Sequence, residues 1–153
     1  MEKNIKNLFP PILVVEDNED HARLIIRTLK KANLMNAITH LKNGEEAINF
    51  LRKEENYSDN EQLVPMLILL DVKMPLKNGF QVLEVIKSDD KLKEIPVVML
   101  TTTSSNDDIA KAMRMGANDY IVKPVKFTDF TEKVSKLGYY WGVISDAKEL
   151  FNS

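Results

Sequence analysis

The sequence has no cysteine among its 153 residues, and the features of several familiar protein classes are also missing. Without cysteine, disulfides and thiolate metal sites are excluded, which fits a reducing compartment. The first residues, Met1 to Asn4, lack the apolar stretch of a secretory signal peptide. The longest apolar runs have only the length of a strand, so none of them can span a bilayer. We therefore expect a soluble, cytoplasmic protein.

The sequence also lacks a strong excess of charge of either sign. Its formal net charge is −2, which gives no bulk attraction for nucleic acid or for an anionic membrane, and we expect neither as a partner. Hydrophobic residues make up 44% of the chain, enough for one well-buried domain of this length. No repeat or linker divides it. We predict a single domain over residues 1–153, with its core at about residues 10–140 and an aromatic, helical C-terminal extension.

Apolar strand-like runs alternate with segments of helical period, which is typical of an α/β protein with a parallel sheet. The predicted strands cover residues 12–16, 37–41, 66–71, 97–100 and 118–122. The predicted helices follow them and begin near residues 18, 43, 78, 105 and 127. Five such units in one domain predict a five-stranded, parallel, doubly wound sheet of flavodoxin-like type. Residues 52–63 are polar and are expected to form a long surface loop.

Charged side chains stand where three of the predicted strands end. Asp71 ends the apolar third strand, Glu16 and Asp17 come at the end of the first, and Lys123 follows the fifth. Ligands of doubly wound sheets bind beyond the carboxyl ends of the strands. If these strands are neighbours, three carboxylates and one ammonium converge at one edge of the sheet.

The chemistry of this cluster favours a hard cation and phosphoryl transfer. Neighbouring carboxylates repel one another unless a cation joins them, and oxygen ligands without histidine or cysteine favour Mg²⁺ (or Mn²⁺). Thr101 would bring a hydroxyl donor to the end of the adjacent strand, and Lys123 a fixed positive charge. A carboxylate in that setting is suited to attack phosphorus, so Asp71 is predicted to form an aspartyl phosphate.

Together these motifs resemble the receiver domain of two-component response regulators, with each motif at a strand end and in the family's order. The motifs are Glu16-Asp17, Asp71 with Met74-Pro75 and Asn78-Gly79, Thr101, and Lys123-Pro124. The resemblance covers about Ile12 to Leu137. It implies a stand-alone phosphoacceptor signalling protein rather than an enzyme, phosphorylated by a sensor histidine kinase and signalling by a change of its surface.

The resemblance also implies a role for each residue of the cluster. Asp71 would be the phosphoacceptor and a metal ligand. Asp17 and the backbone carbonyl of Lys73 would bind Mg²⁺, with Glu16 contributing through water. Lys123 would contact the phosphoryl group.

Two further residues resemble the family's switch pair. The Thr101 hydroxyl would move to the phosphate while the Tyr120 ring turns inward. The Lys123-Pro124 bond would be cis, as X-Pro chemistry allows. Thr102 departs from the very small residue that the family usually carries there, which narrows the approach to Asp71.

A narrower resemblance concerns the class of regulator. The loop of residues 52–63, the run of residues 100–105 and the aromatic C-terminus look like the single-domain regulators paired with bacterial phytochromes. Lys73 and Thr103 flank the phosphate position, and we expect them to tune dephosphorylation. His21 and His40 are expected to be surface or strand residues rather than ligands.

Other interpretations fit these motifs less well. A strand-end Asp71 alone is more typical of a cap or turn. A phosphatase of the haloacid-dehalogenase type would want a second aspartate where Lys73 stands. A flavodoxin would need a hydroxyl-rich phosphate loop at residues 16–20, where this chain is acidic. A scaffold that works without phosphorylation fits the complete acidic set poorly.

The aromatic tail at residues 139–144 has two interpretations that stay open. One is an extended last helix that folds onto its own domain. The other is a homodimer surface on the fourth helix, fifth strand and fifth helix, which receiver domains commonly use.

Overall fold

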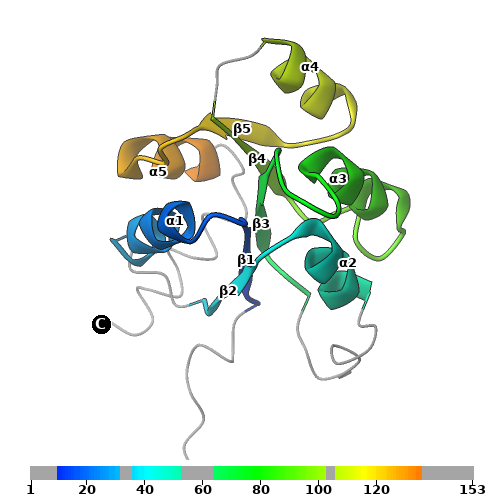
Figure 1. The fold of residues 1–153 in the computed structure, drawn as a ribbon, viewed down its shortest axis with the longest axis horizontal. Coiled ribbons are helices and arrows are strands. Elements are labelled where there is room, and N and C mark those ends of the chain that lie inside the picture. The colour runs from blue at the N-terminus through cyan, green and yellow to red at the C-terminus, as the bar shows by residue number, and fades with distance from the viewer. Residues whose placement is uncertain (1–9, 32–35, 53–63, 103–105, 136–153) are drawn as a thin grey trace, which may run out of the picture.

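The computed structural model describes residues 10–31, 36–52, 64–102 and 106–135, in which strands and helices alternate along the chain (Figure 1). The strands are β1 (Ile12–Val15), β2 (Ile38–Leu41), β3 (Leu67–Asp71), β4 (Val97–Thr101) and β5 (Asp119–Val122). The helices are α1 (Glu19–Lys31), α2 (Gly44–Arg52), α3 (Gly79–Ser88), α4 (Asn106–Arg114) and α5 (Phe127–Ser135).

All five strands form one parallel sheet in the order β2-β1-β3-β4-β5. From β1 the chain adds β2 on one side, and from β3 it adds β4 and β5 on the other, so the strand order switches between β1 and β3. The prediction of a doubly wound, flavodoxin-like sheet is therefore confirmed. The register pairs Val15 with both Leu41 and Leu70, and Asp71 with Leu100. The carboxyl ends of the central strands therefore lie side by side at one edge.

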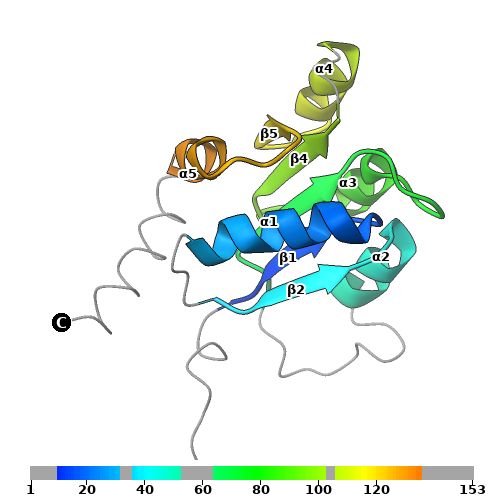
Figure 2. The ribbon, with the colours of Figure 1, turned by 60° about the vertical axis from the view of Figure 1, so that its left-hand side comes forward.

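Helices cover both faces of the sheet (Figures 1 and 2). Helices α1 and α5 lie together on one face, while α2, α3 and α4 lie on the other. Successive residues of β1 alternate between the two cores, so that Leu13 faces α2 and α3 whereas Val14 faces α1 and α5. Every residue of β1, β3 and β4 is buried, which explains why these strands are continuous apolar runs.

Asparagine side chains cap the N-termini of two helices that start beside this edge of the sheet. The Asn18 side chain accepts a hydrogen bond of 3.0 Å from the His21 backbone N–H at the start of α1. Asn78 and Gln81 form a reciprocal capping box at the start of α3. These caps fix where the chain turns from strand to helix next to the predicted site.

Some predictions fall outside the described residues: the loop of residues 53–63, Thr103, Ser105, and the tail beyond residue 135. The fifth strand begins at Asp119, one residue later than predicted. None of the helices within the described ranges has the length and apolar character needed to cross a bilayer.

Candidate functional site

The ends of four strands position the predicted site residues. Asp71 and Thr101 are the last residues of β3 and β4, Glu16 directly follows β1, and Lys123 directly follows β5. Backbone hydrogen bonds continue past the strand ends: the Glu16 N–H donates to the Leu41 carbonyl at 3.0 Å, and the Lys123 N–H donates to the Thr101 carbonyl at 2.7 Å. The site residues are therefore held on rigid backbone.

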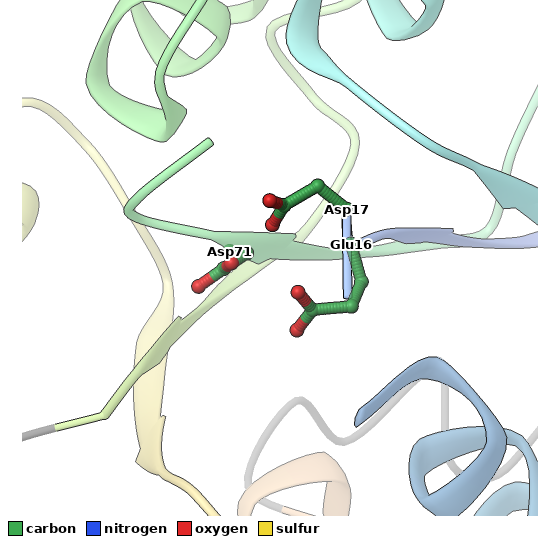
Figure 3. A group of neighbouring side chains, drawn as sticks. All are labelled: Glu16, Asp17 and Asp71. Atoms are coloured by element: carbon green, nitrogen blue, oxygen red, sulfur yellow. The ribbon is translucent and has the colours of Figure 1, made fainter. Parts of the chain in front are cut away.

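Three carboxylates meet at this edge, as the sequence predicted (Figure 3). Glu16, Asp17 and Asp71 each offer an oxygen, and these oxygens all lie within 4.8 Å of one another. Glu16 and Asp71 are buried, whereas Asp17 is exposed. An all-oxygen donor set with one face open to solvent suits a hard, partly hydrated divalent cation.

The Lys123 ammonium joins the cluster and balances part of its charge. Its Nζ forms an ion pair with Glu16 Oε1 and lies 3.2 Å from Asp71 Oδ1. The Lys123 side chain is only 7% exposed. One buried cation thus contacts the two buried carboxylates.

The two buried carboxyls have opposite pKa shifts. Burial, and then the charge of Glu16, raise the pKa of Asp71 to about 7, although Lys123 acts against them. Burial by itself would raise the pKa of Glu16 as well, but hydrogen bonds from Lys123 and from the Asn18 N–H hold it below its ordinary value. Glu16 is therefore the permanent anion of the pair, and Asp71 is only partly ionised near neutral pH until further positive charge approaches.

Two histidines contact the site, which sequence reasoning did not foresee. His21 Nδ1 lies 3.2 Å from Lys123 Nζ and 3.9 Å from Glu16 Oε1. His40 Nε2 lies 2.7 Å from the Glu16 backbone oxygen. His21 stands one helical turn beyond Asp17, and this spacing was the only sequence signal that it could lie near the site. Its contact with Lys123 could not be read from spacing, because the two residues are 102 positions apart.

Gly79 brings α3 against the backbone of Asp71. Its N–H donates to the Val72 carbonyl at 2.8 Å, and a Cβ added here would lie 2.3 Å from the Asp71 carbonyl oxygen. Glycine is therefore required by close approach, which gives a physical reason for the Asn78-Gly79 motif.

The remaining predicted residues lie around this cluster. Thr101 is buried at the end of β4, and Tyr120 is half-buried in β5 with Lys133 Nζ 4.3 Å from its ring centroid. Lys73 is exposed in the loop after β3. The Lys123-Pro124 peptide bond is cis, as the resemblance implied.

A cavity of about 270 Å³ opens beside the ammonium. Its lining residues are His21, Leu24, Ile25, Thr102, Lys123, Pro124 and Val125. The cavity therefore reaches Lys123 between α1 and the loops that follow β4 and β5.

Comparison with known proteins identifies a family whose model spans all the site residues described above. The model of the response regulator receiver domain matches residues 12–135. The probable methanogenesis regulatory protein FilR2 of Methanothrix harundinacea is 38% identical over 130 residues, which are 85% of this chain and 82% of the relative. The response regulator Rcp1 of Synechocystis is 35% identical over 134 residues, which are 86% of this chain and 90% of the relative.

Solved structures of similar proteins share the fold. The bacteriophytochrome response regulator RtBRR has 37% identity and a TM-score of 0.79, and the match covers 85% of this chain and 78% of that one. The Mn²⁺-bound form of Rcp1 has 34% identity and a TM-score of 0.72, covering 87% and 94%. The phosphorylated cyanobacterial phytochrome response regulator RcpA has 36% identity and a TM-score of 0.73, covering 86% and 93%.

Proposed function

This chain belongs to the response regulator receiver domain family, and from that premise we propose that Asp71 accepts a phosphoryl group from a histidine kinase. Membership makes the protein a response regulator of two-component signalling, a phosphoacceptor rather than a catalytic enzyme. The observation that carries the proposal is the position of Asp71, buried at a strand end with Lys123 Nζ at 3.2 Å and two further carboxylates beside it.

The arrangement supports a direct transfer onto Asp71. An Asp71 carboxylate oxygen attacks phosphorus and forms the new O–P bond, while the P–N bond of the donor phosphohistidine breaks and its electron pair stays on the imidazole nitrogen. Lys123, whose Nζ lies 3.2 Å from Asp71 Oδ1, would meet the negative charge of the phosphoryl oxygens. The Thr101 hydroxyl, on the neighbouring strand end, is proposed to contact the same oxygens.

The donor set fits a divalent cation, and we assign Mg²⁺ to it. Asp17, Asp71 and the Lys73 carbonyl would hold the ion, with Glu16 contributing through water. When bound, the ion supplies positive charge that favours ionised Asp71 and neutralises the phosphoryl oxygens. The Mn²⁺-bound form of Rcp1 supports a divalent metal in this family. Exposed Asp17 suits an ion that keeps part of its hydration shell.

The partner is proposed to be a phytochrome-type histidine kinase, because RtBRR and RcpA are both named as regulators of such photoreceptors. Phosphorylation would draw Thr101 toward the phosphate and turn Tyr120 inward, biasing α4 and the loop before it. Helix α4 suits a moving element because Ala112 is its only buried residue.

The face made of α4, β5 and α5 is the proposed surface of a homodimer. It carries two exposed apolar side chains, Met113 on α4 and Phe127 at the start of α5. Sedimentation with and without a phosphoryl mimic tests this part, and a strict monomer in both states contradicts it.

The central proposal is tested with beryllofluoride, which mimics a phosphoryl group on aspartate. Beryllofluoride with Mg²⁺ is expected to raise the melting temperature of the wild-type protein, since a ligand of the folded state alone stabilises it. Asp71→Asn should abolish the shift. A matched change, Asp20→Asn, removes an exposed carboxylate on α1 that lies outside the cluster and should keep the shift. Equal shifts for wild type and Asp71→Asn would refute the assignment.

A further inference from the structure

Four residues around the buried ammonium form a closed ring of hydrogen bonds. Lys123 donates to Glu16 Oε1, and the Asn18 N–H donates to Glu16 Oε2 at 3.1 Å. The His21 N–H donates to Asn18 Oδ1 at 3.0 Å, and Lys123 Nζ lies 3.2 Å from His21 Nδ1, which closes the ring. The first turn of α1 and the loop after β5 are joined through these contacts.

We propose that His21 is a positioning residue for phosphoryl transfer, which accepts a hydrogen bond from Lys123 through Nδ1 and holds the ammonium toward Asp71. This inference rests on the proposed role of Asp71, because Lys123 matters to the reaction only if the phosphoryl group arrives there. It deepens that proposal by adding a residue from α1.

The chemistry of the two groups fixes the tautomer of the imidazole. An ammonium has three N–H donors and no acceptor, so Nδ1 must carry the lone pair and Nε2 the proton. Three acceptors then surround Lys123 Nζ: Glu16 Oε1, Asp71 Oδ1 at 3.2 Å and His21 Nδ1 at 3.2 Å. Their number matches the three N–H groups of the ammonium, which restrains the orientation of the head group.

Without the His21 side chain, one N–H of the Lys123 ammonium would lose its acceptor. Lysine has a flexible four-carbon stem whose head group rotates easily, so an ammonium held by two acceptors keeps more rotational freedom than one held by three. The cavity lined by both His21 and Lys123 would give the freed N–H access to water. The ammonium would then spend less time aligned with Asp71.

Three other roles fit His21 less well. Its part in capping α1 uses only the backbone N–H, which any residue except proline supplies. The side chain is 41% exposed, so it adds little to the core. A role as metal ligand is disfavoured because Nδ1 is already engaged by Lys123.

The first test examines the resting protein and needs no phosphodonor. Imidazole ¹H–¹⁵N NMR of wild-type protein should show His21 with its proton on Nε2 and an unprotonated Nδ1. Lysine-selective ¹⁵N NMR should show the Lys123 ammonium protected from solvent exchange, and His21→Leu should speed that exchange. A proton on Nδ1, or unchanged exchange in His21→Leu, would overturn the proposal.

The second test measures phosphorylation by acetyl phosphate in Mg²⁺, in which Asp71 attacks phosphorus and acetate leaves with the electron pair of the broken P–O bond. His21→Leu should lower the rate by about threefold to tenfold, which corresponds to the loss of one ordinary hydrogen bond. His21→Asn carries an acceptor on the same carbon as Nδ1 and should restore most of the rate.

Two controls separate positioning from a general structural effect. Leu24→Asn alters an exposed residue that lines the same cavity, and it should leave the rate unchanged. In a Lys123→Met background, His21→Leu should cause no further loss, because its effect passes through the ammonium. A further loss of the same size in that background would overturn the proposal.

The two proposals fail in different ways. If wild-type protein is not phosphorylated at all, the assignment of Asp71 fails, and the NMR result still decides whether His21 orients Lys123. If wild type is phosphorylated and His21→Leu is equally fast, only the role of His21 fails.

Discussion

Lys123 Nζ lies 3.2 Å from Asp71 Oδ1, and the two side chains are only 7% and 5% exposed. The same ammonium also pairs with Glu16. Removing these charges from water costs free energy that their attraction does not always recover, so a buried ion pair is weak evidence for stability. We attribute this cluster to the chemistry of the site rather than to the needs of the fold.

Lys123→Met should nevertheless destabilise the protein. It leaves two buried carboxylates without their cation, and breaking such a pair costs about 3 to 5 kcal/mol. Urea unfolding without metal measures the loss. Lys133→Met is the matched control, because its ion pair with Asp119 is more exposed, and it should cost less than about 1 kcal/mol. Equal losses in the two variants would show that the buried cluster has no special energetic role.

Stability without metal should depend on pH through Asp71. Its pKa is 3.8 in the unfolded chain and about 7 in the fold, so the native state binds more protons within that window. The stabilisation is fully present below 3.8 and is lost as pH rises through about 7. Relative to Asp71→Asn, wild type should therefore lose on the order of a few kcal/mol across the window. Urea unfolding of both proteins from pH 5 to 8 measures this difference.

Glu16 also makes the stability depend on pH, but with the opposite sign and at lower pH. Its pKa is below 4.5 in the fold, so its stabilisation is lost as pH falls through that lower value. Measurements above pH 5 thus isolate Asp71. Parallel curves for wild type and Asp71→Asn over that range would contradict the raised pKa.

Asp17→Asn should weaken Mg²⁺ binding with little effect on stability. Asp17 is exposed, yet its oxygen lies with those of Glu16 and Asp71, and one fewer charge beside a divalent ion should raise Kd by at least about tenfold. Isothermal titration calorimetry measures the change. Asp20→Asn, which removes the same charge outside the cluster, serves as the control and should bind Mg²⁺ like wild type. Identical affinities for the two variants would exclude Asp17 as a ligand.

Gly79→Ala should disturb both stability and the site. The added Cβ would lie 2.3 Å from the Asp71 carbonyl oxygen and 2.8 Å from Val72 Cα, so backbone must move at a cost of about 3 kcal/mol. At Gly116 the three atoms nearest to an added Cβ belong to the Lys87 side chain, the nearest at 3.3 Å, but φ is +101°, so Gly116→Ala should cost about 1 kcal/mol. Thermal unfolding ranks the two. A larger loss for Gly116→Ala would contradict the close packing of α3 on Asp71.

The fold and the convergence of the central site residues could be predicted from the sequence for a physical reason. Buried parallel strands appear as apolar runs, and their carboxyl ends must meet at one edge. Asp71, Glu16 and Lys123 were therefore predicted to converge from their places after such runs, and they do.

The contacts of His21 and Gly79 could not be predicted in the same way. The His21–Lys123 contact joins positions 102 residues apart and depends on the rotamers of two long side chains. No periodic pattern encodes such a pairing. Gly79 was predicted to begin a helix, but its approach to the Asp71 carbonyl depends on how α3 packs against the sheet.

The central claim is that one phosphoryl group is carried by Asp71. The most direct measurement is intact-protein and peptide mass spectrometry after incubation with acetyl phosphate and Mg²⁺. We predict one added phosphoryl group on wild type, located at Asp71, removed by hydroxylamine as an acyl phosphate should be, and absent from Asp71→Asn. Undiminished labelling of Asp71→Asn, or no labelling of wild type, would contradict the claim.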